Sequence, residues 1–158
     1  MDDTSATDGP RVVSAEREIA AGAEAIFELI ADPARQPEWD GNDNLADAPT
    51  GQRIHAVGEV FSTNLTQGSV RENHVVEFEE NRLLAWRPSE PGREQPGHLW
   101  RWELEALGPG RTRVRHTYDW SQLTDESRFG TARATTADKL TASLDRLAAL
   151  AESSGAGS

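Results

Sequence analysis

Residues 100–118, WRWELEALGPGRTRVRHTY, form two alternating segments around a Gly-Pro-Gly turn. If residues 108–110 are the loop of a hairpin, side chains two positions apart share one face of it. One face then pairs Glu103 with Arg115, Glu105 with Arg113, and Leu107 with Arg111. The other face pairs Trp100 with Tyr118, Trp102 with His116, and Leu104 with Val114. A slip of one residue would spoil both patterns, so the stretch predicts an antiparallel hairpin with one wet and one buried face.

Two more hairpins are predicted upstream of this one. Gln67-Gly68 suits a two-residue turn, because glycine tolerates a positive φ. That turn pairs Leu65 with Val70, Thr63 with Glu72, and Phe61 with His74. A second turn around Asn81 pairs Phe78 with Leu84 and Val76 with Trp86. Together the three hairpins predict an antiparallel sheet.

Helical spacing flanks the predicted sheet on both sides. Residues 11–20 can form a first strand, and residues 23–31 (AEAIFELIA) can form a helix with one apolar face: Ala23, Ile26, Phe27 and Ile30. Pro33 ends that helix, because the residue before a proline avoids the helical region, and a short turn at 34–39 follows. Thr124 can cap a short turn that starts at Asp125. A long C-terminal helix, capped by Thr135 or Thr136 and followed by Gly155, has the apolar stripe Ala137, Leu140, Leu144, Leu147 and Ala151.

The length of 158 residues fits one α+β domain, which we place at residues 11–152. Residues 1–10 and 153–158 are predicted to be flexible tails, because they are small, polar and without an apolar pattern.

The formal net charge of −11, from 16 basic and 27 acidic residues, disfavours binding to nucleic acids and to anionic membranes. With no cysteine, disulfides and thiolate metal sites are excluded. No stretch approaches the roughly 20 apolar residues of a membrane helix, and residues 1–10 do not resemble a signal peptide. We therefore expect a cytoplasmic protein without membrane insertion.

Strand alternation places many aromatic and polar side chains on the inward face of the sheet. These are Phe61, Thr63, Glu72, His74, Val76, Phe78, Trp86, His98, Trp100, Trp102, His116, Tyr118 and Trp120. A solid core is expected to hold more Leu, Ile and Val, whereas ligand pockets combine apolar walls with a few polar groups. We therefore predict a ligand pocket lined by Phe61, Thr63, Trp86, Trp100, Trp102, Tyr118 and Trp120. The alternative for each single tryptophan is ordinary packing.

Four of these inward residues are candidates for acid–base chemistry: His74, His116, Glu72 and Tyr118. For His98, which follows a long Pro/Gly loop at residues 89–97, a merely structural role is favoured. That loop either borders the pocket mouth or is an ordinary hairpin connection. None of the four histidines has a short metal-ligand spacing, so we expect no metal and no cofactor.

Several segments resemble the START-like (SRPBCC) superfamily, and most of all its polyketide cyclase/dehydrase branch. The resemblance is carried by AEAIFELIADP (23–33), PEW (37–39), VGEVF (57–61), NRLLAW (81–86) and GPGRTRV (108–114). It implies a helix-grip fold, in which a seven-stranded antiparallel sheet wraps around the long C-terminal helix, with two short helices after the first strand.

The same resemblance implies three kinds of function, because the superfamily includes carriers, enzymes and co-chaperones. The first is binding of a small hydrophobic or amphipathic molecule, such as a lipid or a polyketide-like compound, in an internal cavity. The second is a cyclase or dehydratase that uses His, Glu and Tyr as acid–base groups. The third is a co-chaperone-like interaction module.

Overall fold

The computed structural model describes residues 11–40 and 45–156, with side chains of the last helix as far as Ser153. Within these residues, seven strands form one antiparallel sheet in the order β1-β7-β6-β5-β4-β3-β2. The strands are β1 (Val12–Ile19), β2 (Leu45–Asp47), β3 (Val60–Leu65), β4 (Val70–Glu79), β5 (Leu83–Ser89), β6 (Leu99–Gly108) and β7 (Arg111–Asp119). The helices are α2 (Ala23–Ala31), α3 (Gln36–Trp39), α4 (Phe129–Ala134) and α5 (Ala137–Ala156), with 3-10 turns η1 (Pro33–Arg35) and η2 (Glu126–Arg128).

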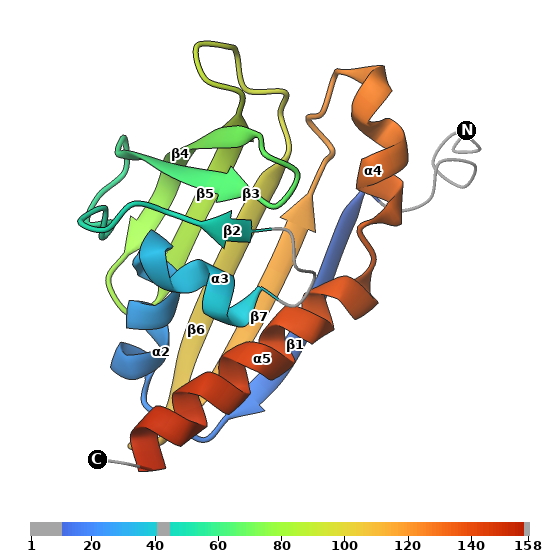
Figure 1. Cartoon of the computed structure of the whole chain (residues 1–158). Coiled ribbons are helices and arrows are strands. Elements are labelled where there is room, and N and C mark those ends of the chain that lie inside the picture. Colours follow the sequence, from blue (N-terminus) through green and yellow to red (C-terminus); the bar gives the residue numbers. More distant parts are fainter. Residues whose placement is uncertain (1–10, 41–44, 157–158) are drawn as a thin grey trace, which may run out of the picture.

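Helix α5 lies diagonally across one face of the sheet, in front of β1, β7 and β6, and α2 and α3 lie beside it on the same face (Figure 1). We call this face of the sheet the inner face. The arrangement confirms the predicted helix-grip α+β fold with its seven-stranded antiparallel sheet.

The main core lies between the inner face and the helices. Helix α2 contributes Ile26, Phe27 and Ile30, all fully buried, which confirms the apolar face predicted for it. From α5 the buried residues include Leu140, Leu144, Leu147 and Ala151. Ala137 is exposed, so the buried stripe starts one turn later than predicted. The helix continues to Ala156, through Gly155 and residues 153–156 of the predicted tail.

The β6–β7 hairpin has the predicted register. Trp100 pairs with Tyr118, Trp102 with His116, Glu103 with Arg115, Leu104 with Val114, and Glu105 with Arg113. One prediction at the turn is wrong: Arg111 pairs with Gly108 instead of Leu107, because a bulge between Ala106 and Gly108 takes up one residue.

The β3–β4 register is one residue away from the predicted one. Phe61 pairs with Asn73 and Thr63 with Arg71, where the two-residue turn had placed His74 and Glu72. The actual turn is longer, since the Leu65 carbonyl accepts from Gly68 N (2.9 Å) and Leu65 N donates to the Ser69 carbonyl (2.8 Å). Gly68 adopts φ +96°, as glycine does in a turn that ends in a bulge.

A bulge between Val75 and Glu77 of β4 shifts the register by one residue again, so that the residues after it regain the predicted pairing with β5. Trp86 therefore pairs with Val75, not with Val76 as predicted, while Phe78 still pairs with Leu84 as predicted. Phe78 packs on the core and meets the ring of Phe27 edge-on at 5.8 Å.

After β7, the 3-10 turn η2 is capped by the Asp125 side chain, which accepts from Ser127 N (3.1 Å). The predicted cap, Thr124, is therefore wrong by one residue.

Candidate ligand-binding site

Five rings from β6, β7 and the residue before β6 form a continuous series on the inner face, which we call the aromatic ladder: Trp102, His116, Trp100, Tyr118 and His98. The His116 ring lies between two indoles, stacked 3.7 Å from Trp102 and 5.5 Å from Trp100 between ring centroids. Trp100 then meets Tyr118 at 4.4 Å, and Tyr118 meets His98 at 6.0 Å. The confirmed hairpin register produces this order, because facing residues of neighbouring strands alternate along one face.

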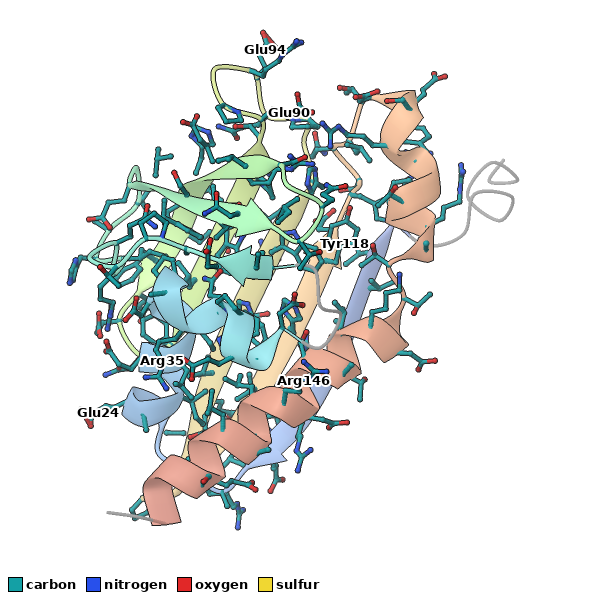
Figure 2. The ribbon with its side chains drawn as sticks, in the orientation of Figure 1. Glu24, Arg35, Glu90, Glu94, Tyr118 and Arg146 are labelled. Atoms are coloured by element: carbon teal, nitrogen blue, oxygen red, sulfur yellow. The ribbon has the colours of Figure 1, made fainter. Side chains whose placement is uncertain are left out.

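The ladder joins two hydrophobic clusters. Trp102 belongs to the main core, where Trp39 of α3 meets it edge-on at 5.1 Å. Tyr118 belongs to a smaller cluster under α4, with Trp120, Leu123, Ala132 and Leu140. Trp100 packs against both clusters and is only partly buried. In Figure 2, Tyr118 lies above α5. Trp100 is thus partly exposed between two buried neighbours in the ladder, His116 and Tyr118.

Each end of the ladder carries a buried ring nitrogen without a hydrogen-bond partner among the described residues. These atoms are Trp102 Nε1 and His98 Nδ1. Trp102 Nε1 can only donate, and leaving a buried donor unpaired costs about 1–3 kcal/mol. By contrast, Trp39 Nε1 donates to the Leu29 carbonyl (2.8 Å) and His116 Nδ1 donates to the Arg101 carbonyl (3.3 Å). Two unpaired nitrogens on one wall are sites where water or a ligand can bind.

The titratable rings of the ladder are neutral at physiological pH. Burial lowers the pKa of His116 to about 3 and the pKa of His98 to about 4. Burial also raises the pKa of Tyr118 to about 12, against a small opposing effect of Arg128. A good general base has a pKa near the working pH, so these rings are suited to hydrogen bonding and stacking and poorly suited to proton transfer.

Two of the four acid–base candidates lie outside this site. Glu72 pairs with Ser62 and His74 with Val60, so both side chains lie on the outer face of the sheet, away from Phe61. The prediction that they point inward is therefore wrong. His74 Nε2 forms a hydrogen bond with Ser89 Oγ there (3.0 Å). The structure therefore groups only His116 and Tyr118 among the candidates. Val76 is likewise displaced from the inner face by the bulge in β4.

Two residues that were not predicted to point inward, Asn73 and Arg71, replace Glu72 and His74 on the inner face. Asn73 is buried opposite Phe61, and its Nδ2 donates to Thr63 Oγ1 (3.2 Å) and to the Phe61 carbonyl (3.3 Å). Arg71 faces Thr63 in the next pair on the same face. No local signal separated the two registers, because Gly68 suits the bulged turn as well as the two-residue turn.

The other predicted ligand residues, Phe61, Thr63, Trp86 and Trp120, are all buried. Phe61 meets the ring of Trp86 edge-on at 5.3 Å, and Thr63 is 3% exposed. Trp120 lies away from them, under Phe129 (5.6 Å), with the guanidinium groups of Arg11 and Arg133 at 4.7 and 5.8 Å from its ring.

Two surface grooves lie apart from the ladder. One, of about 550 Å³, runs between the loop at 90–96 and residues 124–128, where Arg128 forms ion pairs with Glu90 (3.1 Å) and Asp125 (3.2 Å). The other, of about 410 Å³, lies on the outer face among paired Glu and Arg side chains. Neither groove is lined by a predicted ligand residue, although the first borders the loop at 89–97.

Among residues 11–40 and 45–156, no helix is both long and apolar enough to cross a membrane. In the same part of the chain, no group of three or more His, Asp or Glu side chains is arranged to hold a metal ion.

A family model described as polyketide cyclase / dehydrase and lipid transport matches residues 10–152. The uncharacterized protein Rv0088 of Mycobacterium tuberculosis is 36% identical over 115 residues, which cover 71% of this chain and 49% of that protein. A second M. tuberculosis protein, MT0096, is 34% identical with the same coverage. The chain thus spans about half the length of these two relatives.

Solved structures share the fold at low identity. The ZhuI aromatase/cyclase from a Streptomyces species has a TM-score of 0.65 and 17% identity, covering 90% of this chain and 93% of that one. Norcoclaurine synthase from Thalictrum flavum, a point mutant in complex with a transition-state analogue, has a TM-score of 0.58 and 16% identity, covering 90% and 94%. These likenesses show the fold alone.

Proposed function

Because this chain belongs to the polyketide cyclase/dehydrase and lipid transport family, we propose that it binds a small hydrophobic or amphipathic molecule between the sheet and α5. The ligand is lipid-like or polyketide-like, and its apolar body lies against the aromatic ladder. Phe61, Thr63 and Trp86 continue the wall on β3 and β5. We place Trp120 outside this wall, under α4, where it packs against Phe129.

The observation that carries the proposal is the pair of unpaired ring nitrogens, Trp102 Nε1 and His98 Nδ1. Buried polar groups in folded proteins nearly always have a partner, so each unpaired one calls for an explanation. A ligand with a hydroxyl or carbonyl oxygen satisfies the Trp102 donor, while its apolar part covers the partly exposed ring of Trp100. Both features lie on one face within a single series of touching rings.

Acid–base catalysis has less support from the same residues. Glu72 and His74 lie on the opposite face, and burial keeps His116 neutral and weakly basic. As for an interaction module, the exposed large hydrophobic residues of the described chain are four valines: Val12, Val57, Val60 and Val70. Binding is therefore the function that the geometry favours.

The test is titration of the protein with N-phenyl-1-naphthylamine, a neutral apolar probe whose fluorescence rises in apolar surroundings. We expect saturable binding by the parent protein and at least about tenfold weaker binding by Trp100→Ala, since an aromatic contact of about 1.4 kcal/mol corresponds to that factor. Because Trp100 is only partly buried, the stability loss should be below the roughly 3–5 kcal/mol of a filled core site.

The matched control is Trp120→Ala, which removes a fully buried tryptophan outside the ladder. It should lose about 3–5 kcal/mol of stability and, where it remains folded, keep the probe affinity of the parent. If the parent protein binds no probe while Trp100→Ala loses as much stability as Trp120→Ala, the inner face is a filled core and the proposal is wrong.

A further inference from the structure

Arg71 is a cation on the inner face of the sheet. It pairs with Thr63 across β3 and β4, and paired residues in an antiparallel sheet lie on the same side. That side is the inner one, because Thr63 is buried and Phe61, two residues earlier on β3, belongs to the main core. Arg71 itself is half-buried. The predicted register placed the Glu72 carboxylate on this face, opposite Thr63. The observed register places the Arg71 guanidinium there instead.

Arg71 forms no ion pair with a carboxylate of the described residues. None of the ion pairs there involves Arg71, although the whole chain carries a net charge of −11. Its one side-chain hydrogen bond to the described residues runs from Nη1 to the Val70 carbonyl (3.2 Å). Two other arginines near this end of the sheet are engaged: Arg128 with Glu90 and Asp125, and Arg87 with the Gly97 carbonyl (2.7 Å).

The strand pairing places Arg71 at the end of the sheet where His98 lies. After burial, the positive charges of Arg128, Arg71 and Arg87 lower the pKa of His98. Asn73, two residues after Arg71, pairs with Pro88 of β5. Trp86, two residues before Pro88, pairs with Trp100, which lies two residues after His98. The unpaired Nδ1 of His98 and the guanidinium of Arg71 are thus at one end of the candidate site.

We infer that Arg71 binds the carboxylate of an amphipathic ligand whose apolar body lies along the aromatic ladder, an assignment that rests on the proposed function. A guanidinium matches the planar carboxylate through two parallel hydrogen bonds, and such charge-assisted bonds are the strong ones. A single guanidinium balances a single negative charge. A dianionic phosphate would need a second cation, and Arg87 and Arg128 already have partners.

The experiment compares three ligands with the same ten-carbon chain and different head groups: decanoate, 1-decanol and decyl phosphate. Binding to the full chain is measured by titration calorimetry below micelle-forming concentrations. We expect decanoate to bind about 10- to 100-fold more tightly than decanol, the factor that a hydrogen bond to a charged group provides. Arg71→Gln should remove this preference and keep the affinity for decanol.

Two further variants separate the local contact from general charge. Arg71→Lys keeps the positive charge but cannot form the two parallel hydrogen bonds of a guanidinium. It should retain part of the preference for decanoate. Arg93→Gln removes the same charge from an exposed side chain in the loop at 90–96 and should leave the preference unchanged. Equal binding of decanoate and decanol by the parent would overturn the assignment of Arg71 while leaving the pocket in place. Tighter binding of decyl phosphate would overturn the choice of a carboxylate, and failure of all three ligands would overturn the pocket as well.

Discussion

Acidification should destabilise this protein well before its carboxylates are protonated. Burial lowers the pKa of His116 from an ordinary 6.5 to about 3, and that of His98 to about 4. Below pH 6.5 the unfolded chain therefore binds protons that the folded chain excludes. The free energy of unfolding therefore falls as the pH falls below 6.5. The contribution of each histidine is fully lost only near its pKa in the folded protein, about 3 for His116 and about 4 for His98.

The expected size of the effect follows from these values. One pKa unit corresponds to 1.36 kcal/mol, so each histidine should remove about 2 kcal/mol between about pH 7.5 and about pH 5. Together they remove about 4 kcal/mol, a large part of the roughly 5–15 kcal/mol by which domains are stable. The lowered pKa values of Glu28, Glu77 and Asp125 act in the same direction but at lower pH, since these groups start from 4.5 or 3.8.

The assay is urea unfolding followed by tryptophan fluorescence at a series of pH values. His116→Gln should be less stable at neutral pH, yet its free energy of unfolding should fall about half as steeply with decreasing pH, because one of the two neutral histidines is gone. The double variant with His98→Gln should be nearly flat above about pH 5. If the parent and the double variant lose the same free energy over this range, the two rings are not held neutral by burial.

Three substitutions test the packing and the register of the strands and loops around the site. Gly97→Ala should destabilise by at least about 2 kcal/mol, because φ is +120° and the new Cβ would lie 2.1 Å from the Gln122 carbonyl oxygen. Thermal melts measure both this loss and that of the control Gly92→Ala, which has φ +74° but open space around it and should lose only about 1 kcal/mol. Equal losses in the two variants would contradict a clash with Gln122 as the cause. Glu105→Ala breaks an exposed ion pair with Arg113 (2.8 Å) and should change stability by only about 0.2–1 kcal/mol in urea titrations, so a larger loss would show that the pair does more than mark the register.

Local patterns in the sequence determined the class of fold and its best-defined hairpin. Residues 100–118 specify their own pairing, because charge complementarity on one face and aromatic residues on the other agree on a single register. The apolar spacing of α2 and α5 likewise predicts which side of each helix is buried. From these elements the sequence predicts all five members of the ladder on the inward face: His98, Trp100, Trp102, His116 and Tyr118.

Tertiary structure decided which polar groups join those rings. A single extra residue in the turn at Gly68 moves Glu72 and His74 to the outer face and brings Arg71 and Asn73 inward. Turn length cannot be read from a Gln-Gly pair, because the glycine suits both the two-residue turn and the bulged one. Burial then turns His116 from a candidate base into a neutral ring between two indoles. Alternation with a period of two predicts which residues of one strand share a face, but across a turn of unknown length it cannot predict which face of the next strand matches. The desolvation that sets a pKa depends on every element packed around the group, so it too requires the tertiary structure.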